Sequence, residues 1–560
     1  MKKVIVFFMI LASISVFSQD FIYSRQLKPG MKGYGLTVFQ GDKIEKFKVD
    51  ILGVLKNMVP GENRVLIRCE GDFVNKAGII AGMSGSPVFI DGKLAGAVSF
   101  GWEFGKEPIG GLTPIEDMLD VINTYSSGEV QEIMFDKKPN IEDIINPKPE
   151  NFMPERLKKF FANNDFVATG FESLPFASSG TGGIDYSYEK KPEEGGPIAV
   201  ALTRGDLNLY AIGTITYVKN NYILAFGHPM FGLGHVSIPI HSAKILAIYP
   251  SYKSSNKIGI IGKEIGTLVE DRSAAILGIK GKKAYMIPIN VKLNLKNKTK
   301  EYSIEVAEEP LLTPFLVNLV FSSVLQNATK NVGFSTFNLR GKIKVEGYPD
   351  IILNSLITGA NYQTTVYQIA SLVSAVIQNP YVKARIEGIS VDLNFVEDIR
   401  FAQIMKVKSS TTKVKRGKSV HLQVYLKPFQ KDLMIKNVII KVPKTVKPGK
   451  YYIELGDGFT IMKRQSKVLA RRIETLDGFI RLVNRFLRNN KVYVSLAGNT
   501  NAVFMGESVQ PDLPGSIVDT IKTQSTYIPK TNKWKQYYSV DILTLPYVVK
   551  GYFLIPIEIE

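Results

Sequence analysis

The segment Gly-Met-Ser-Gly-Ser-Pro at residues 82–87 is the part of this sequence best suited to nucleophilic chemistry. Strand-like apolar runs flank it, which predicts a tight turn between two β-strands. Glycines around Ser84 permit a backbone that presents the hydroxyl and points N–H groups at a developing oxyanion. Ser84 is therefore the candidate nucleophile, and the N–H groups of Gly82 and Ser84 are the candidate oxyanion hole. The alternative is a Gly/Ser turn that only joins two strands.

A serine nucleophile needs a base, and the chain contains four histidines. His228 follows an apolar strand at a Gly-His-Pro turn and is the candidate general base. His235 and His241 lie seven and thirteen residues further on, a spacing that matches no helix face on which three ligands would converge. We expect both to be packed or rim histidines, and His421 to lie on the surface. The sequence therefore predicts no metal site and no organic cofactor.

Chain length, cysteine count and charge limit the number of domains and the kinds of site that this protein can contain. A chain of 560 residues, 45% of them hydrophobic, exceeds one compact core and predicts three or four domains. The single cysteine, Cys69, excludes an intrachain disulfide and any zinc site that needs two thiolates. Lys and Arg number 70 against 51 Asp and Glu, which gives a formal charge of +19.

The first eighteen residues have the pattern of a signal peptide. Lys2 and Lys3 precede the apolar run VIVFFMILASISVF, which is too short to span a bilayer. We therefore expect cleavage near Ser18, export to the periplasm, cell envelope or extracellular space, and no transmembrane span in the mature chain. Export makes nucleic acid an unexpected partner, so the positive charge is expected to face an anionic envelope surface or solvent.

The first 300 residues predict two β units and a connector. Short alternating runs with Gly-Asp and Asp-Gly turns predict a nucleophile half-barrel over 21–125, closed by a helix that begins with a capping box at Thr113. Charged and proline-rich sequence predicts a connector over 126–195, with one short helix at 154–163. Strand patterns resume over 196–300 and predict a histidine half-barrel.

The remaining residues predict additional modules. A mixed α/β region is expected over 301–395, with core helices at 314–326 and 365–378. Period-two alternation predicts a β-sandwich-like module over 396–465, followed by a C-terminal α/β tail region over 466–560. The expected fold class is mainly β with α segments.

Two blocks of the sequence resemble the SpoIVB-type serine peptidases, serine peptidase family 55, a branch of the chymotrypsin-like clan. The first block, at 33–120, contains KIEKFKVDILGV, AGIIAGMSGSPVFIDGKLAGAV and GGLTPIEDML. The second, at 196–280, contains AIGTITYVKNNYILAFGHP and IGKEIGTLVEDRSAAILGIKG. The resemblance implies a chymotrypsin-like double β-barrel, with Ser84 as nucleophile and His228 as base.

The sequence departs from this family in three respects. The serine block precedes the histidine block, the reverse of the family's order, and the family's amino-terminal PDZ module is not evident. The family's acidic residue lies about fifteen residues before its serine, where this chain has Cys69. By a small shift we favour Asp72 as the acid, with Glu70 and Asp271 as alternatives. A Ser-His dyad, with all three carboxylates in ordinary turns or ion pairs, also remains open.

The sequence thus predicts an exported serine endopeptidase that hydrolyses protein or peptide substrates through an acyl-enzyme. A non-catalytic cell-envelope scaffold or binding protein that retains the peptidase fold is the alternative. Residues 301–560 contain no recognisable chemistry, which favours this alternative.

Overall fold

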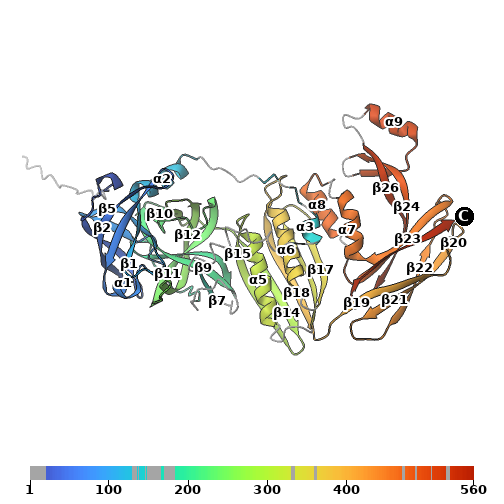
Figure 1. Ribbon diagram of the computed structural model, residues 1–560, viewed down its shortest axis with the longest axis horizontal. Coiled ribbons are helices and arrows are strands. Elements are labelled where there is room, and N and C mark those ends of the chain that lie inside the picture. The colour runs from blue at the N-terminus through green and yellow to red at the C-terminus, as the bar shows by residue number, and fades with distance from the viewer. Residues whose placement is uncertain are drawn as a thin grey trace, which may run out of the picture.

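The computed structural model describes the chain from residue 21 to residue 560 with several gaps. The described residues are 21–128, 135–136, 138–139, 141–145, 147, 166–169, 183–328, 335–358, 362–469, 473–485, 488–505, 508–524 and 530–560. The predicted signal peptide and the predicted helix at 154–163 lie outside them. The molecule is elongated, with its units in a row from the amino-terminal barrel to a C-terminal sandwich (Figure 1).

The first unit is a closed six-stranded barrel with the strand order β1-β2-β3-β6-β5-β4. Its strands are β1 (Lys32–Val38), β2 (Ile44–Val59), β3 (Glu62–Glu70), β4 (Pro87–Ile90), β5 (Lys93–Gly101) and β6 (Ile109–Pro114). Asp91 and Gly92 join β4 to β5 with φ of 51° and 74°, as a two-residue hairpin turn requires. Val49, Ile67 and Leu112 are fully or almost fully buried inside the barrel.

Three helical elements accompany this barrel: η1 (Ser24–Gln26), α1 (Asp72–Ala77) and α2 (Ile115–Ser126). The position of α2 confirms the predicted helix, but the predicted capping box is wrong. The Thr113 hydroxyl donates instead to the Gly227 carbonyl in the second unit, at 2.6 Å. Glu116 Oε1 accepts from the Ser24 N–H at 2.8 Å. Tertiary contacts therefore use both side chains that the local motif would have needed.

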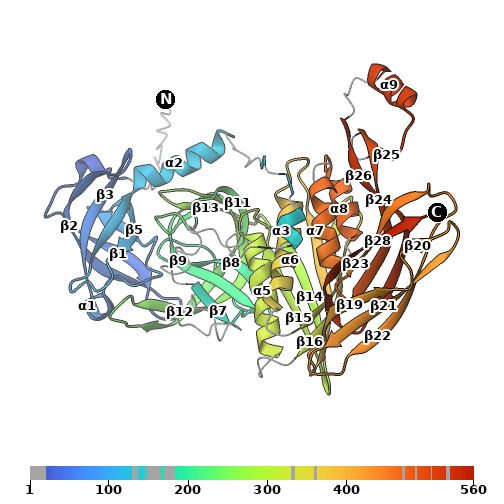
Figure 2. The ribbon, with the colours of Figure 1, turned by 45° about the vertical axis from the view of Figure 1, so that its right-hand side comes forward.

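The second unit is also a ring of strands, in the order β8-β11-β12-β13-β10-β9, which the pairing of β9 with β8 closes. Its strands are β7 (Phe166–Thr169), β8 (Pro197–Gly205), β9 (Asn208–Lys219), β10 (Tyr222–Ala225), β11 (Gly234–Tyr249), β12 (Asn256–Asp271) and β13 (Ile276–Lys280). The first seven residues of β8 are all buried, because this strand lies between neighbours and under packed side chains. The chain thus contains two β-barrels side by side (Figure 2).

The third unit continues the same sheet outward, where β15 pairs with β8. It contains β14 (Met286–Leu295), β15 (Lys298–Ala307), β16 (Thr336–Val345), β17 (Ile351–Thr358) and β18 (Ile386–Val396). The helices α5 (Thr313–Ala328) and α6 (Tyr362–Ile377) cover one face of this sheet (Figure 1). The short helix α3 (Ile141–Ile145) is tied to α6 through a hydrogen bond from Ser371 Oγ to the Asp143 carbonyl. Both predicted helices of this region are confirmed.

The fourth unit is a β-sandwich with accompanying helices. Its strands are β19 (Phe401–Ser409), β20 (Lys413–Val414), β21 (Ser419–Pro428), β22 (Met434–Lys441), β23 (Gly449–Asp457), β24 (Lys491–Met505), β25 (Ser508–Pro511), β26 (Lys530–Thr544), β27 (Val548–Lys550) and β28 (Tyr552–Ile559). Its helices are α7 (Gly458–Leu469), α8 (Leu476–Asn484) and α9 (Gly515–Gln524). Of these, α7 and α8 lie on the side of the third unit, and α9 lies apart from them (Figure 1). Strands from the region 466–560 pair with β23, so both sequence regions contribute to one sandwich core.

The predicted fold class, mainly β with α segments and a double β-barrel, is confirmed by this arrangement. In the described part of the chain, no helix combines the length and apolar character needed to cross a membrane.

The two barrels meet at the turn that contains Ser84. The Thr214 N–H donates to the Ser84 carbonyl at 2.8 Å, and Thr216 Oγ1 donates to the Gly85 carbonyl at 2.7 Å. A Cβ on Gly85 would stand 1.9 Å from the Thr214 carbonyl oxygen and 2.5 Å from the Phe226 nitrogen. Only glycine allows the second barrel to approach this closely.

We therefore predict that Gly85→Ala lowers the free energy of unfolding by about 2 kcal/mol or more, through backbone overlap and a strained φ of +93°. Chemical denaturation of the mature protein measures the effect. Gly53→Ala is the matched control, because a Cβ there would meet nothing within 4 Å. Equal unfolding midpoints for the two variants would contradict the close approach of the barrels.

Candidate active site

The turn that carries Ser84 is held by its own backbone hydrogen bonds. The Met83 N–H donates to the Ile80 carbonyl at 2.9 Å, and the Gly85 N–H donates to the Val98 carbonyl at 2.7 Å. Gly82 and Gly85 adopt φ of +94° and +93°, which side chains rarely tolerate. The side chain of Ser84 is half-buried, so the hydroxyl lies at an accessible surface of a rigid turn.

The N–H groups of Gly82 and Ser84 have no hydrogen-bond partner in the part of the chain that the structure describes. Their orientation is nevertheless fixed, because each belongs to a planar peptide whose carbonyl is bonded. The Ala81 carbonyl accepts from the Lys257 N–H at 3.0 Å, and the Met83 carbonyl accepts from the Ser86 N–H at 2.8 Å. Two oriented, unpaired amides around a serine are the elements of an oxyanion hole.

His228 lies in a turn that follows β10. Phe226 and Gly227 have φ of 68° and 66°, and the bond from Thr113 holds the Gly227 carbonyl. His228 Nδ1 lies 2.8 Å from the carbonyl oxygen of Pro229. Because a carbonyl oxygen can only accept, we assign the proton to Nδ1, which leaves Nε2 unprotonated. This is the tautomer that a general base requires.

The turn that carries Ser84 and the turn that carries His228 both lie against the Val98 carbonyl, through Gly85 and Gly227. The Val98 carbonyl accepts from the Gly85 N–H at 2.7 Å, and it lies 3.1 Å from the point where a Cβ on Gly227 would stand. No hydrogen bond joins Ser84 Oγ to His228 among the described residues. Such bonds are often long in resting enzymes and shorten when substrate binds.

Asp271, one of the alternative acids, holds the turn that follows His228. Its buried carboxylate accepts from the N–H groups of Met230, Phe231 and Leu233 at 2.7, 2.8 and 3.2 Å. The Met230 N–H and the Pro229 carbonyl belong to one peptide. The Asp271 carboxylate and the His228 imidazole therefore bind the two ends of one peptide group, and the charge of the carboxylate polarises that group.

The side chain of His228 is half-buried and that of Asp271 is buried, and the pKa of each group reflects the loss of surrounding water. Burial lowers the pKa of His228 below its usual value, while the bond to the Pro229 carbonyl and the negative charge of Asp271 oppose that shift. Burial raises the pKa of Asp271, and the backbone N–H groups that it accepts oppose the shift.

The other two candidate acids lie elsewhere in the first barrel. Asp72 is the exposed first residue of α1, and Glu70 is the exposed last residue of β3. Within the described ranges, neither forms a hydrogen bond or an ion pair with His228. Cys69 is fully buried, and burial raises the pKa of its thiol to about 12.

The other three histidines occupy separate environments. His235 Nδ1 lies 3.0 Å from Glu270 Oε1, and His241 is fully buried with Nδ1 2.8 Å from the Gly262 carbonyl. His421 is exposed on β21. Among the described residues, no group of three or more His, Cys, Asp or Glu side chains is arranged to hold a metal ion.

The residues of the second barrel that hold the Ser84 turn were not predicted from the sequence. Thr214 Oγ1 donates to the Gly82 carbonyl at 2.8 Å, in addition to its backbone bond to Ser84. Lys257 lies against Gly82 and is only 4% exposed, and burial lowers the pKa of its ammonium group to about 7. Thr214 and Thr216 could have been noticed as two hydroxyls on one face of an otherwise apolar strand.

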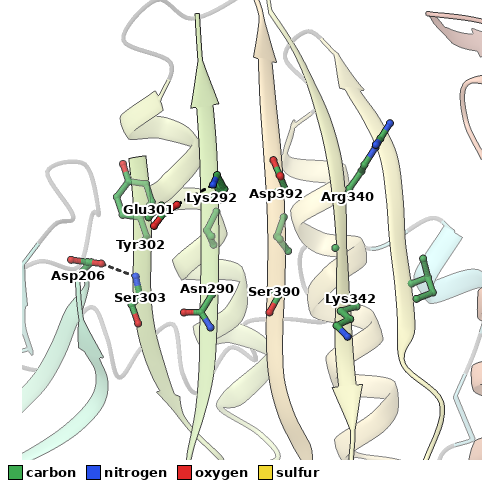
Figure 3. A pocket seen from close by; sticks show the side chains of 14 residues that line it. Asp206, Asn290, Lys292, Glu301, Tyr302, Ser303, Arg340, Lys342, Ser390 and Asp392 are labelled. Carbon is green, nitrogen blue, oxygen red and sulfur yellow. Dashed lines mark hydrogen bonds and ion pairs between the residues drawn. The ribbon is translucent and has the colours of Figure 1, made fainter. Parts of the chain in front are cut away.

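A surface hollow of about 690 Å³ lies on the third unit, away from this site. It occupies the sheet face opposite α5 and α6, where side chains of both charge signs point outward (Figure 3). Lys292 pairs there with Glu301 at 3.2 Å, while Arg340 and Asp392 lie further along the sheet. None of its lining residues belongs to the Ser84 turn or the His228 turn.

Two adjoining β-barrels, with the serine turn and the histidine turn where they meet, form the architecture of a mainly-β peptidase fold. Residues 18–119 match the family model described as SpoIVB peptidase S55, so this part of the chain is similar to that family. The match covers the barrel that carries Ser84. Neither the curated proteins nor the solved structures contain a significant match.

Proposed function

We propose that this protein is an exported serine endopeptidase of SpoIVB type that acts on protein or peptide substrates through an acyl-enzyme. The observation that carries the proposal is the pair of oriented, unpaired N–H groups of Gly82 and Ser84, together with His228, to whose Nδ1 we assign the proton from its distance to the Pro229 carbonyl. The family match over 18–119 supports the same reaction class. The basic, apolar pattern of residues 1–18 supports export.

In the proposed mechanism, His228 Nε2 removes the proton from Ser84 Oγ as the oxygen attacks the scissile carbonyl. The developing oxyanion accepts from the Gly82 and Ser84 N–H groups. The imidazolium then donates its proton to the leaving amine, and water hydrolyses the acyl-enzyme by the same route.

We assign the role of the acidic third member of the proposed catalytic triad to Asp271 rather than to Asp72 or Glu70. A catalytic imidazole needs an acceptor at Nδ1 that fixes the tautomer and stabilises the positive charge. The Pro229 carbonyl supplies this acceptor, and Asp271 supplies negative charge across the Pro229–Met230 peptide. Asp271 is thus a positioning residue that acts through the backbone.

The lack of a Ser84–His228 hydrogen bond in the described residues also favours the scaffold alternative. It predicts that the wild-type protein neither reacts with fluorophosphonates nor cleaves peptides. Reaction of the wild-type protein at Ser84 therefore separates the two functions directly.

We predict that Ser84→Ala abolishes fluorophosphonate labelling and lowers turnover of a casein-type substrate by about 10⁶-fold, as loss of a serine nucleophile does in the best-studied case. Ser86→Ala is the matched control two residues away, because its buried Oγ has no partner among the described residues. The control should label like wild type. Unchanged cleavage by Ser84→Ala would refute the nucleophile assignment.

We predict that the acid limb of the pH profile of kcat/KM lies below the ordinary histidine pKa of about 6.5. The base works only when it is unprotonated, and burial lowers the pKa of His228, so activity persists to lower pH before protonation removes it. Initial rates across pH 4 to 8 measure the limb. A limb above this value would contradict the buried environment of His228.

We predict that Asp271→Asn lowers kcat/KM by about 10- to 100-fold, less than the roughly 10⁴-fold loss when a carboxylate touches the imidazole directly. The acid limb should also move to lower pH, because the charge of Asp271 raises the pKa of His228. Asp72→Asn and Glu70→Gln are controls that should change neither quantity. A large loss in either control alone would transfer the role to that residue.

A further inference from the structure

Lys257 is a buried lysine beside the nucleophile turn that the proposed mechanism does not use. It lies near the start of β12 with 4% of its surface exposed. Its Nζ donates to Thr37 Oγ1 at 2.7 Å, and it forms no ion pair in the described part of the chain. Burying an ammonium group without a carboxylate partner is energetically costly. This cost argues that the amine has a role at the interface that an apolar side chain would not fill.

The backbone and the side-chain carbons of Lys257 contact the Ala81–Gly82 peptide, whose N–H group is one of the two proposed oxyanion donors. The Lys257 N–H donates to the Ala81 carbonyl at 3.0 Å, and the Ala81 N–H donates to the Ser255 carbonyl at 2.7 Å. A Cβ on Gly82 would stand 3.0 to 3.2 Å from three carbons of the lysine stem. Gly82 therefore rests directly against the stem, which limits its movement.

The amine of Lys257 begins a chain of hydrogen bonds that ends on the same glycine. Thr214 Oγ1 donates its single hydrogen to the Gly82 carbonyl at 2.8 Å. Thr37 Oγ1 lies 3.4 Å from Thr214 Oγ1, so Thr37 must be the donor of that pair. The hydrogen of Thr37 is then committed, and Lys257 Nζ must donate to Thr37. The chain therefore runs in one direction, from Lys257 through two threonines to Gly82.

We infer that Lys257 is a positioning residue for the oxyanion hole, holding the peptides on both sides of Gly82 so that the Gly82 and Ser84 N–H groups converge. The inference rests on the proposed function, because it names what orients that site. Oxyanion donors are effective when they are held in place before the reaction. Lys257 contributes by orientation and does not touch the reacting atoms.

The test is the variant Lys257→Met, which keeps the stem and removes the amine. We expect kcat to fall about 10- to 100-fold, somewhat less than loss of an oxyanion donor itself, while KM changes less than about twofold. Affinity for a peptide aldehyde should fall by a similar factor, because its hemiacetal oxygen uses the same two amides. The unfolding midpoint in denaturant should not decrease, since the variant no longer buries an amine.

Two further variants separate positioning from general damage. Thr214→Val interrupts the same chain, so adding it to Lys257→Met should cost less than the sum of the two single losses. Lys263→Met is the matched control on the same strand, where the exposed lysine pairs with Glu189, and its kcat should equal that of wild type.

The outcomes distinguish the two proposals. A wild-type protein that is neither labelled by a fluorophosphonate nor able to cleave peptides overturns the proposed function. An active wild type with unchanged kcat and aldehyde affinity in Lys257→Met overturns the role of Lys257 alone. A loss of kcat that only follows a lower unfolding midpoint would also overturn it, because the lysine would then be merely structural.

Discussion

The contact between the Ser84 turn and the second barrel is the constraint on which the rest of the site depends. Thr214 donates to the carbonyls of both Gly82 and Ser84, and Gly85 has no space for a side chain against Thr214. These bonds satisfy the carbonyls of the turn and leave two N–H groups free. The proposed oxyanion hole therefore depends on the way in which the second barrel packs against a turn of the first.

Near His228, buried side chains likewise orient backbone groups at the interface between the barrels. Thr113 from the first barrel holds the Gly227 carbonyl, and Asp271 from the second holds the amides after Pro229. Glu309, which accepts from the Leu311 and Leu312 N–H groups before α5, is buried near Asp271. Burial raises the pKa of Glu309 to about 7, and the charge of Asp271 adds to the effect. The segment of the third unit between β15 and α5 thus lies near Asp271.

Much of the fold could be predicted from local patterns. The Asp91-Gly92 hairpin, α2, α5 and α6 lie where turn chemistry and hydrophobic periodicity placed them. The pairing partners of the long strands could not be predicted, because a period-two pattern defines the faces of a strand and not its neighbours. The continuation of one sheet from the second barrel into the third unit, through β8 and β15, is such a case.

The candidate site likewise contains residues that the sequence predicted and contacts that only the tertiary structure shows. Local sequence was sufficient to single out Ser84, the Gly82 and Ser84 amides and His228, because glycine-rich turns after apolar strands are short-range features. Only the tertiary structure revealed the contacts of Thr113, Thr214 and Lys257 with these turns, and the backbone contact of Asp271, which the sequence had offered as an alternative acid. Lys257 reaches Thr37 across 220 positions of sequence. No local pattern records such a distance, since it depends on how two separately closed barrels pack together.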